Sequence, residues 1–213
     1  MKTTLILVRH GFSVSNDQKF FTGNMDIPLT EKGVLQAERC AQYLKDFRID
    51  KIYSSDLSRA MDTAQPIARE KNLPVQPDSA LREIYAGKWE GVPFTVLETT
   101  FPASYKVWKE DIGNAVCDGG ESVQAFSERI LSAVSRIARE NEGRRILIAT
   151  HATPIRVLCT VSSGLPISEM ASVPWVANAS INIFEYENGI FSLVRKDITD
   201  HLGDMKTALP KNV

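Results

Sequence analysis

The sequence predicts an α/β fold with a mostly parallel central sheet. Residues 5–8 and 146–149 are unbroken aliphatic runs, which is typical of strands that are buried on both faces of a sheet. Segments with helical periodicity alternate with these and other short strand-like runs, as in chains that form parallel sheets. With 213 residues, of which 43% are hydrophobic, the chain can form one substantial core, so we expect a single domain over residues 1–213.

The first predicted helix and the second predicted strand follow a polar loop. Thr30 is placed to cap a helix over residues 31–45, and we expect Val34 and Leu35 on its inner face, together with apolar residues further along. Residues 51–54 are predicted to form the second strand. Each of the first two strands is therefore followed by a helix.

The second helix and the middle of the chain are less regular. Ser55 or Asp56 is expected to cap the helix after the second strand, and Pro66 is expected to kink or divide that helix. Residues 74–120 have weak periodicity and several prolines and glycines. We therefore expect them to form an insertion over the edge of the sheet.

The last third of the chain predicts an amphipathic helix, a strand, a second helix and a hairpin. These elements are placed at residues 121–140, at 146–150, from about 153 onward, and at 181–186 with 190–194. Asn188 and Gly189 separate the last two runs and form a strong signal for a type I′ turn.

Composition and charge argue against several classes of protein. The chain has 25 lysines and arginines and 26 aspartates and glutamates, so its net charge of -1 gives no electrostatic reason to expect nucleic acid or membrane as a partner. The three cysteines are widely spaced, which fits reduced, buried thiols better than disulfides or a zinc site. No apolar run is long enough for a signal peptide or a membrane span. We therefore expect a cytoplasmic protein, with a homodimer left open.

Two of the three histidines end predicted strands. His10 follows Arg9 and precedes Gly11 at the end of the first strand, and His151 ends the strand over residues 146–150. Neighbouring parallel strands have their carboxyl ends at one edge of the sheet, so both rings are expected to face one pocket. The alternative for each is a strand-end histidine that only satisfies a loop carbonyl. His201 lies in a polar segment and is expected on the surface.

Five ordered motifs of this chain resemble the histidine phosphatase superfamily, the phosphoglycerate mutase-like proteins. They are Arg9-His10-Gly11-x-Ser13-x-x-Asn16, residues 21–33 from Phe21-Thr22-Gly23 to Gly33, residues 54–64 with Ser54-Ser55-Asp56-Leu57-x-Arg59, residues 81–91 with Leu81-Arg82-Glu83, and residues 119–122 followed by Thr150-His151. The resemblance covers most of the chain. It implies a three-layer α/β/α sandwich in which residues 74–120 cover the active site.

The resemblance implies phosphoryl transfer through a covalent intermediate. His10 matches the nucleophile, which forms a phosphohistidine, and neutral imidazole is a competent nucleophile near pH 7. Arg9 and Arg59 match two clamps, since planar guanidinium groups fit the equatorial oxygens of a transferring phosphoryl group. His151 matches a second histidine that contacts the phosphoryl group and donates to it in the transition state.

Three further positions match supporting roles in the family. Asn16 corresponds to an amide that reaches the phosphate, and Gly23 to a backbone N–H that does so. Glu83 corresponds to the carboxyl that protonates the leaving oxygen and later activates water. The alternative for Glu83 is an ion pair with Arg82 or Lys88.

The chain departs from the family beside both histidines. Phe12 stands where an acidic or amide residue is common, and Ala152 stands where glycine is usual. We expect both to line the substrate pocket, and Phe12 to favour an apolar or ring-bearing leaving group. Four aromatic residues of the middle segment are expected either to form a substrate lid or to belong to the core. They are Trp89, Phe94, Tyr105 and Trp108.

Three functions are consistent with these residues. Hydrolysis of small phosphate esters without metal or other cofactor is favoured, because no acidic cluster has metal-ligand spacing. A phosphoglycerate mutase would need 2,3-bisphosphoglycerate and a basic insertion, but only Lys106 and Lys109 are basic between Gly91 and Gly120. A non-catalytic phosphate-ester binder is the third, although binding alone would not need Glu83 as a proton donor.

Overall fold

The computed structural model describes residues 1–207 and contains a six-stranded sheet with the order β3-β2-β4-β1-β5-β6. The strands are β1 (Thr3–Arg9), β2 (Lys51–Ser54), β3 (Val75–Pro77), β4 (Arg145–Thr150), β5 (Ile181–Glu187) and β6 (Ile190–Ile198). The first four strands pair in parallel, whereas β5 runs antiparallel to both β1 and β6. The predicted mostly parallel sheet is confirmed.

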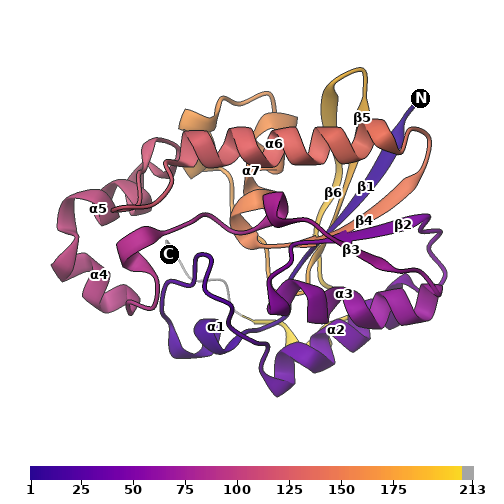
Figure 1. Ribbon diagram of the computed structural model, residues 1–213, viewed down its shortest axis with the longest axis horizontal. Helices are drawn as coiled ribbons and strands as arrows, with labels where there is room; N and C mark the ends of the chain where they lie inside the picture. Colours follow the sequence, from indigo (N-terminus) through magenta and orange to yellow (C-terminus); the bar gives the residue numbers. More distant parts are fainter. Residues whose placement is uncertain (208–213) are drawn as a thin grey trace.

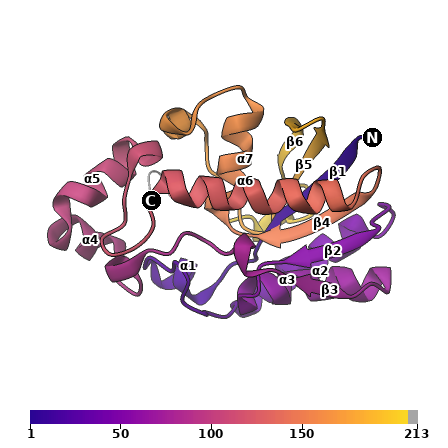
Figure 2. The ribbon, with the colours of Figure 1, turned by 45° about the horizontal axis from the view of Figure 1, so that its top comes forward.

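Helices cover both faces of this sheet (Figure 1, Figure 2). Helices α6 (Val123–Glu140) and α7 (Ala152–Ser162) lie on one face, and α2 (Glu31–Leu44) and α3 (Ser58–Lys71) lie on the other. The short helices α1 (Val14–Gln18), α4 (Phe94–Thr100) and α5 (Pro102–Glu110) lie beyond the end of the sheet toward which β1 runs. The three-layer sandwich is therefore confirmed. None of the helices within residues 1–207 combines the length and apolar composition that crossing a bilayer requires.

Alternate residues of β1 belong to two hydrophobic cores. Leu5 and Leu7 pack in the core beneath α6 and α7, whereas Ile6 and Val8 pack in the core against α2 and α3. All four side chains are at most 2% exposed. Because both faces of β1 are covered, the strand needs an unbroken aliphatic run rather than an alternating one.

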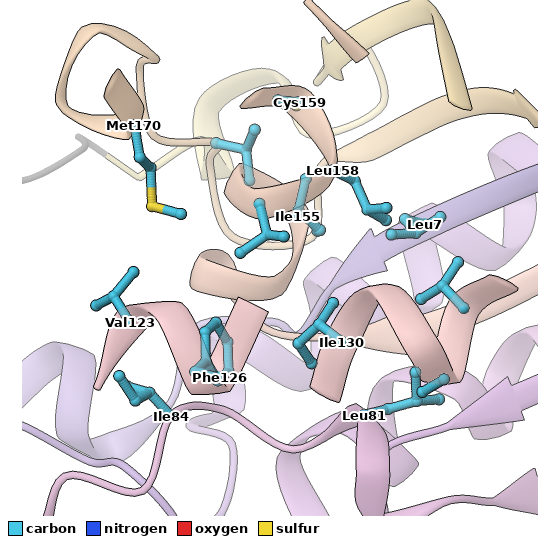
Figure 3. Close-up of a cluster of buried hydrophobic side chains, with 14 of the residues drawn as sticks. Leu7, Leu81, Ile84, Val123, Phe126, Ile130, Ile155, Leu158, Cys159 and Met170 are labelled. Atoms are coloured by element: carbon cyan, nitrogen blue, oxygen red, sulfur yellow. The ribbon is translucent and has the colours of Figure 1, made fainter. Parts of the chain in front are cut away.

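The larger core holds α7 against α6 and the sheet (Figure 3). Phe126 and Ile130 of α6 lie opposite Ile155 of α7, in the same cluster of buried side chains. This packing fixes the N-terminal end of α7, where His151 and Ala152 lie.

The start of α6 differs slightly from the prediction. The Ser122 hydroxyl accepts a hydrogen bond from the Ala125 N–H at 3.1 Å, so α6 begins two residues later than the predicted start.

The inner face of α2 differs from the prediction. Thr30 caps the helix as expected and accepts from the Gly33 N–H at 3.1 Å. Val34 and Leu35, however, are 48% and 55% exposed. The residues that are buried share one helical stripe, and they are Gly33, Gln36, Ala37, Cys40, Ala41 and Leu44. The stripe that contains the later apolar residues passes through Gly33 and Gln36, and this places Val34 and Leu35 outside it.

The start and the interior of α3 also differ from the prediction. Neither Ser55 nor Asp56 caps the helix, and Asp26 of the loop before α2 instead accepts from the Ser58 N–H at 2.7 Å. A carboxylate from another loop thus satisfies an orphan donor of the first turn. Pro66 does not divide α3, which runs unbroken from Ser58 to Lys71, because the packing of the helix onto α2 and the sheet offsets the one hydrogen bond that a proline cannot donate.

Residues 74–120 begin inside the sheet. Strand β3 pairs in parallel with β2 at the edge, and three residues ending in Pro77 are too short to give a periodic signal. The segment then leaves the sheet and carries α4 and α5. At the other edge, the predicted hairpin is confirmed, since Asn188 and Gly189 have φ of 52° and 84° as a type I′ turn requires.

All three cysteines are free and buried, as predicted. Burial raises the pKa of the Cys40 thiol to about 12 and that of Cys159 to about 11. These thiols stay protonated and act as small apolar side chains.

Candidate active site

The carboxyl ends of β1 and β4 bring His10 and His151 together. In the parallel register Arg9 pairs with Thr150, so the residue after each is a histidine at the same edge. The His10 backbone N–H donates to the Thr150 carbonyl at 2.9 Å. The two ring centroids lie 5.2 Å apart with an interplanar angle of 62°. The prediction that the strand ends bring the two rings together is thereby confirmed.

The His10 ring is oriented by the backbone. Its Nδ1 lies 2.7 Å from the Gly11 carbonyl oxygen, and a carbonyl only accepts, so Nδ1 carries the proton. The unprotonated nitrogen is then Nε2, on a ring that lines the cavity. Burial, together with the positive charges of Arg59 and Arg9, holds the pKa of His10 well below its usual value of 6.5. His10 is therefore a neutral imidazole at physiological pH.

The His151 ring is oriented by a side chain. It is fully buried, with Nε2 at 2.9 Å from the Ser55 hydroxyl and with no partner for Nδ1 within residues 1–207. Burial and the charge of Arg59 hold its pKa well below 6.5. The ring lies against His10 but does not itself line the cavity. The predicted contact of His151 with substrate therefore stays a prediction.

Arg9 and Arg59 are buried and fixed by loop carbonyls. Arg9 Nη1 donates to the Val176 carbonyl at 2.6 Å, and the two Nη atoms of Arg59 donate to the carbonyls of Met25 and Gly23 at 2.8 and 2.9 Å. The Nε atoms have no partner among the described residues. Burial lowers the pKa of each guanidinium to about 10, so both remain cations at neutral pH. The site thus holds two rigid positive charges, and Arg59 is not a surface residue.

Asn16 and Gly23 lie on the loop side of the cavity. Asn16 Oδ1 accepts from the Ser13 N–H at 3.2 Å and from the Ser13 hydroxyl at 3.0 Å, in the capping box of α1. Gly23 has a φ of 52°, and a Cβ at this position would clash with the Glu90 carboxylate. Both conditions favour glycine, which leaves its backbone accessible from the cavity.

Glu83 is held at the beginning of α7. Its Oε1 accepts from the Ile84 N–H at 2.8 Å and its Oε2 accepts from the Thr153 N–H at 3.2 Å. Arg82 instead pairs with Asp56, with 2.6 Å between Nη2 and Oδ2. Within residues 1–207 Glu83 forms no salt bridge, so the alternative that it pairs with Arg82 or Lys88 is wrong.

These side chains surround a cavity of about 680 Å³. Eight of the nine predicted site residues line it, and His151 is the exception: the eight are Arg9, His10, Phe12, Asn16, Gly23, Arg59, Glu83 and Ala152. Several other lining residues were not singled out from the sequence, and they include Lys32, Trp175, Asn178, Lys206 and Thr207. The last four belong to segments beside β5 and after β6, which carry no motif of the resemblance.

Comparison with known proteins agrees with this geometry. The family model for the histidine phosphatase superfamily (branch 1) matches residues 5–199. The chain belongs to the histidine phosphatase superfamily. Phosphoserine phosphatase 1 of Hydrogenobacter thermophilus is 30% identical over 200 residues, which cover 94% of each chain. Adenosylcobalamin/alpha-ribazole phosphatase of Salmonella typhimurium is 31% identical over 202 residues, with 95% of this chain and 94% of the relative covered. The solved structure of Bacillus stearothermophilus YhfR superposes with a TM-score of 0.89 at 30% identity, covering 94% and 99% of the two chains.

The aromatic residues of the middle segment of this histidine phosphatase divide into two groups. Trp89 and Tyr105 are at most 3% exposed, do not line the cavity, and belong to the larger core. Phe94 and Trp108 line the cavity, and Trp108 stacks edge-on against Phe21 with centroids 5.1 Å apart. The core interpretation holds for Trp89, Tyr105 and also Trp108, which is 4% exposed, while Phe94 and Trp108 form part of the cavity wall.

His201 is not the solvated surface residue that the sequence predicted. It is partly buried, stacks on Tyr43 with centroids 5.2 Å apart, and places Nε2 at 3.0 Å from the Ala179 carbonyl. Ala179 has a φ of 53°, so this histidine supports a strained turn next to β5. The polar neighbours of His201 in the sequence predicted exposure. The residues that His201 contacts, Tyr43 and Ala179, are far from it along the chain and gave no local signal.

Proposed function

We propose that this protein hydrolyses small phosphate monoesters through a phosphohistidine on His10, without a metal ion. The observation that carries the proposal is the His10 ring, neutral and with Nδ1 held by the Gly11 carbonyl, on a cavity that two buried guanidinium groups also line. A phosphoryl dianion in this cavity would meet fixed positive charge from Arg9 and Arg59. Membership of the superfamily and the phosphatase names of the relatives support hydrolysis.

The first step transfers the phosphoryl group to the enzyme. The lone pair of His10 Nε2 attacks phosphorus in line, and the N–P bond forms as the bond to the leaving oxygen breaks. Glu83, protonated at this stage, gives its proton to the leaving oxygen so that an alcohol departs. The buried guanidinium groups stabilise the charge on the three equatorial oxygens.

The second step releases phosphate. A water molecule attacks the phosphohistidine, Glu83 takes its proton, and the N–P bond breaks to restore neutral His10. Because Glu83 lines the same cavity as His10, one carboxyl can serve both steps.

Charge in the middle segment favours a hydrolase over a mutase. The only basic residues between Gly91 and Gly120 are Lys106 and Lys109. Lys109 pairs with Glu98, Lys106 lies 3.9 Å from Glu110, and neither lysine lines the cavity. A doubly acidic phosphoglycerate would therefore find no unpaired cation in this segment.

The cavity favours esters whose leaving group carries a ring or another apolar body. Phe12, Phe94, Trp108 and Trp175 all line it, and 680 Å³ exceeds what a phosphate group alone fills. Replacing Phe12 with Gln is expected to lower kcat/KM for naphthyl phosphate about 3- to 10-fold relative to glycerol phosphate. Tyr85→Gln is the matched control, since Tyr85 is 44% exposed and lies outside the cavity. An unchanged ratio of the two substrates in Phe12→Gln contradicts the aromatic preference.

Turnover in chelator-treated buffer tests the main proposal. Purified protein in EDTA is expected to release phosphate from a panel of aryl and alkyl phosphates. Turnover that appears only after a divalent metal is added overturns metal-independence, and no turnover at all favours the binder. Phosphoryl exchange that depends on 2,3-bisphosphoglycerate, without release of phosphate, favours the mutase.

We also propose a cytoplasmic setting and a free small-molecule substrate. The reduced, buried cysteines and the net charge of -1 support this setting and give no basis for a nucleic-acid or membrane partner. Fractionation of cells that produce the protein tests the location.

A further inference from the structure

Asn178 lies outside every motif of the chain, yet its side chain joins several parts of the site. It is 4% exposed, lines the cavity and precedes β5. Its Nδ2 lies 2.9 Å from Asn16 Oδ1, 3.3 Å from the His10 carbonyl oxygen and 3.4 Å from the Gly11 carbonyl oxygen. Its Oδ1 accepts from the Thr207 hydroxyl at 3.1 Å.

These surroundings allow one orientation of the Asn178 amide. The carbonyls of His10 and Gly11 only accept hydrogen bonds, so the group that faces them must be the NH₂ group. One hydrogen of that group is shared between the two carbonyls, and the other points to Asn16. The opposite atom of Asn178 is then the oxygen, and the Thr207 hydroxyl donates to it at 3.1 Å.

The orientation of Asn178 in turn fixes that of Asn16. Because an NH₂ group faces it, the nearer atom of Asn16 must be its oxygen. The Ser13 N–H donates to the same oxygen, which supports the same orientation. Asn16 Nδ2 has no acceptor within residues 1–207, on a side chain that lines the cavity. It is a donor available to an anion, whereas a flipped amide would present an oxygen and repel one.

We propose that Asn178 is a positioning residue that holds Asn16 with its N–H groups toward the phosphoryl group, and that Thr207 holds Asn178. The inference rests on the proposed function and on the role that the family resemblance gives Asn16, which is to donate to the substrate phosphate. It makes the segment before β5 and the segment after β6 part of the phosphate site. Neither segment takes part in the chemical steps.

Asn178→Ala tests the positioning role. It is expected to lower kcat/KM for an aryl phosphate about 10- to 100-fold, the effect of losing a hydrogen bond to a charged group. Asn141→Ala is the matched control, because Asn141 is 1% exposed and its Nδ2 donates to the Ile137 carbonyl at 2.8 Å, away from the cavity. Both variants are expected to lower Tm, but only Asn178→Ala lowers kcat/KM. Equal kinetic losses in the two variants overturn the proposal.

A double-mutant cycle with Asn16→Ala separates positioning from general damage. If Asn178 acts through Asn16, the double variant is expected to be hardly slower than Asn16→Ala alone, and losses that multiply overturn the proposal. The same measurements on the wild type test the proposed function, on which this inference rests. If the wild type has no turnover, the proposed function is wrong. If the wild type is active and the kcat/KM losses of the two single variants multiply in the double variant, only the role of Asn178 is wrong.

Thr207 provides a conservative pair of variants. Thr207→Ser keeps the hydroxyl and is expected to keep wild-type kcat/KM, whereas Thr207→Val keeps the shape but loses the donor. The loss in Thr207→Val is expected to be about 3- to 10-fold, the range for one neutral hydrogen bond. A Thr207→Val variant with full kcat/KM overturns the part of the proposal that assigns Thr207.

Discussion

The two sides of this site are held by different kinds of contact. On the β1 side the orientation of His10 comes from the backbone, since the Gly11 carbonyl accepts from Nδ1 at 2.7 Å. On the β4 side it comes from a side chain, since the Ser55 hydroxyl lies 2.9 Å from His151 Nε2. A substitution cannot remove the first contact directly, but a single substitution removes the second.

This difference gives two identical residues different tasks. The Ser55 hydroxyl accepts from the Leu57 N–H at 3.4 Å and keeps a proton that it can donate to His151 Nε2. In that arrangement neutral His151 carries its proton on Nδ1, which has no partner within residues 1–207, whereas the Nδ1 proton of His10 is bound by the Gly11 carbonyl. That tautomer leaves His10 with a free lone pair and His151 with a free N–H, as a nucleophile and a donor require.

Removing the nucleophile has the largest expected effect. His10→Ala is expected to lower kcat about 10⁵-fold or more, as loss of a covalent nucleophile does in other enzymes, with little change in Tm. Alkaline quenching with a ³²P-labelled ester is expected to trap a phosphoenzyme in the wild type and none in the variant. A ³²P-labelled phosphoenzyme that still forms in His10→Ala shows that another residue is the nucleophile. That result contradicts the assignment of His10 as nucleophile and His151 as donor.

The β4 side is tested next through Glu83. Glu83→Gln keeps an oxygen that accepts from the Thr153 N–H but cannot donate a proton to the leaving group. Turnover of alkyl phosphates is expected to fall about 10²- to 10⁴-fold, the range for general acid catalysis. Nitrophenyl phosphate needs no such proton and is expected to lose far less. Equal losses on both substrates remove Glu83 from the acid role.

The same contrast explains what the sequence could predict. His10 and His151 end apolar runs that strand pairing forces side by side, so a local pattern located both. Asn178 has no such pattern, because its contacts to Asn16 and Thr207 join segments far apart in the chain. The same limit explains Asp26 at the start of α3, where a distant loop supplies the cap.

Ser55→Ala tests whether a side chain controls the His151 ring. Without the hydroxyl the ring loses its tautomer preference, and kcat is expected to fall about 10- to 100-fold, with a smaller change in KM. The matched control is Ser54→Ala, since the Ser54 hydroxyl is equally buried but donates to the Ser55 carbonyl at 2.8 Å. Ser55→Thr is expected to restore part of the loss. Similar kcat values for Ser54→Ala and Ser55→Ala contradict the assignment.

The smallest expected effect is on the pH dependence of the free energy of unfolding. It arises because His10 and His151 are both buried as neutral rings. Burial lowers the pKa of both His10 and His151 in the fold, whereas in the unfolded chain each titrates near 6.5. Below pH 6.5 the unfolded chain therefore binds more protons, and the free energy of unfolding falls by up to about 1.4 kcal/mol per pH unit for each ring. His10→Gln and His151→Gln are each expected to reduce the loss of stability between pH 7 and pH 5.5 by about 1 kcal/mol, measured by urea unfolding. His10 is held by a backbone carbonyl and His151 by a hydroxyl, so the two rings differ in their hydrogen-bond partner but share their burial. If both variants reduce the pH-dependent loss of stability equally, burial sets both pKa values. If only one variant reduces it, the hydrogen-bond partner sets them instead.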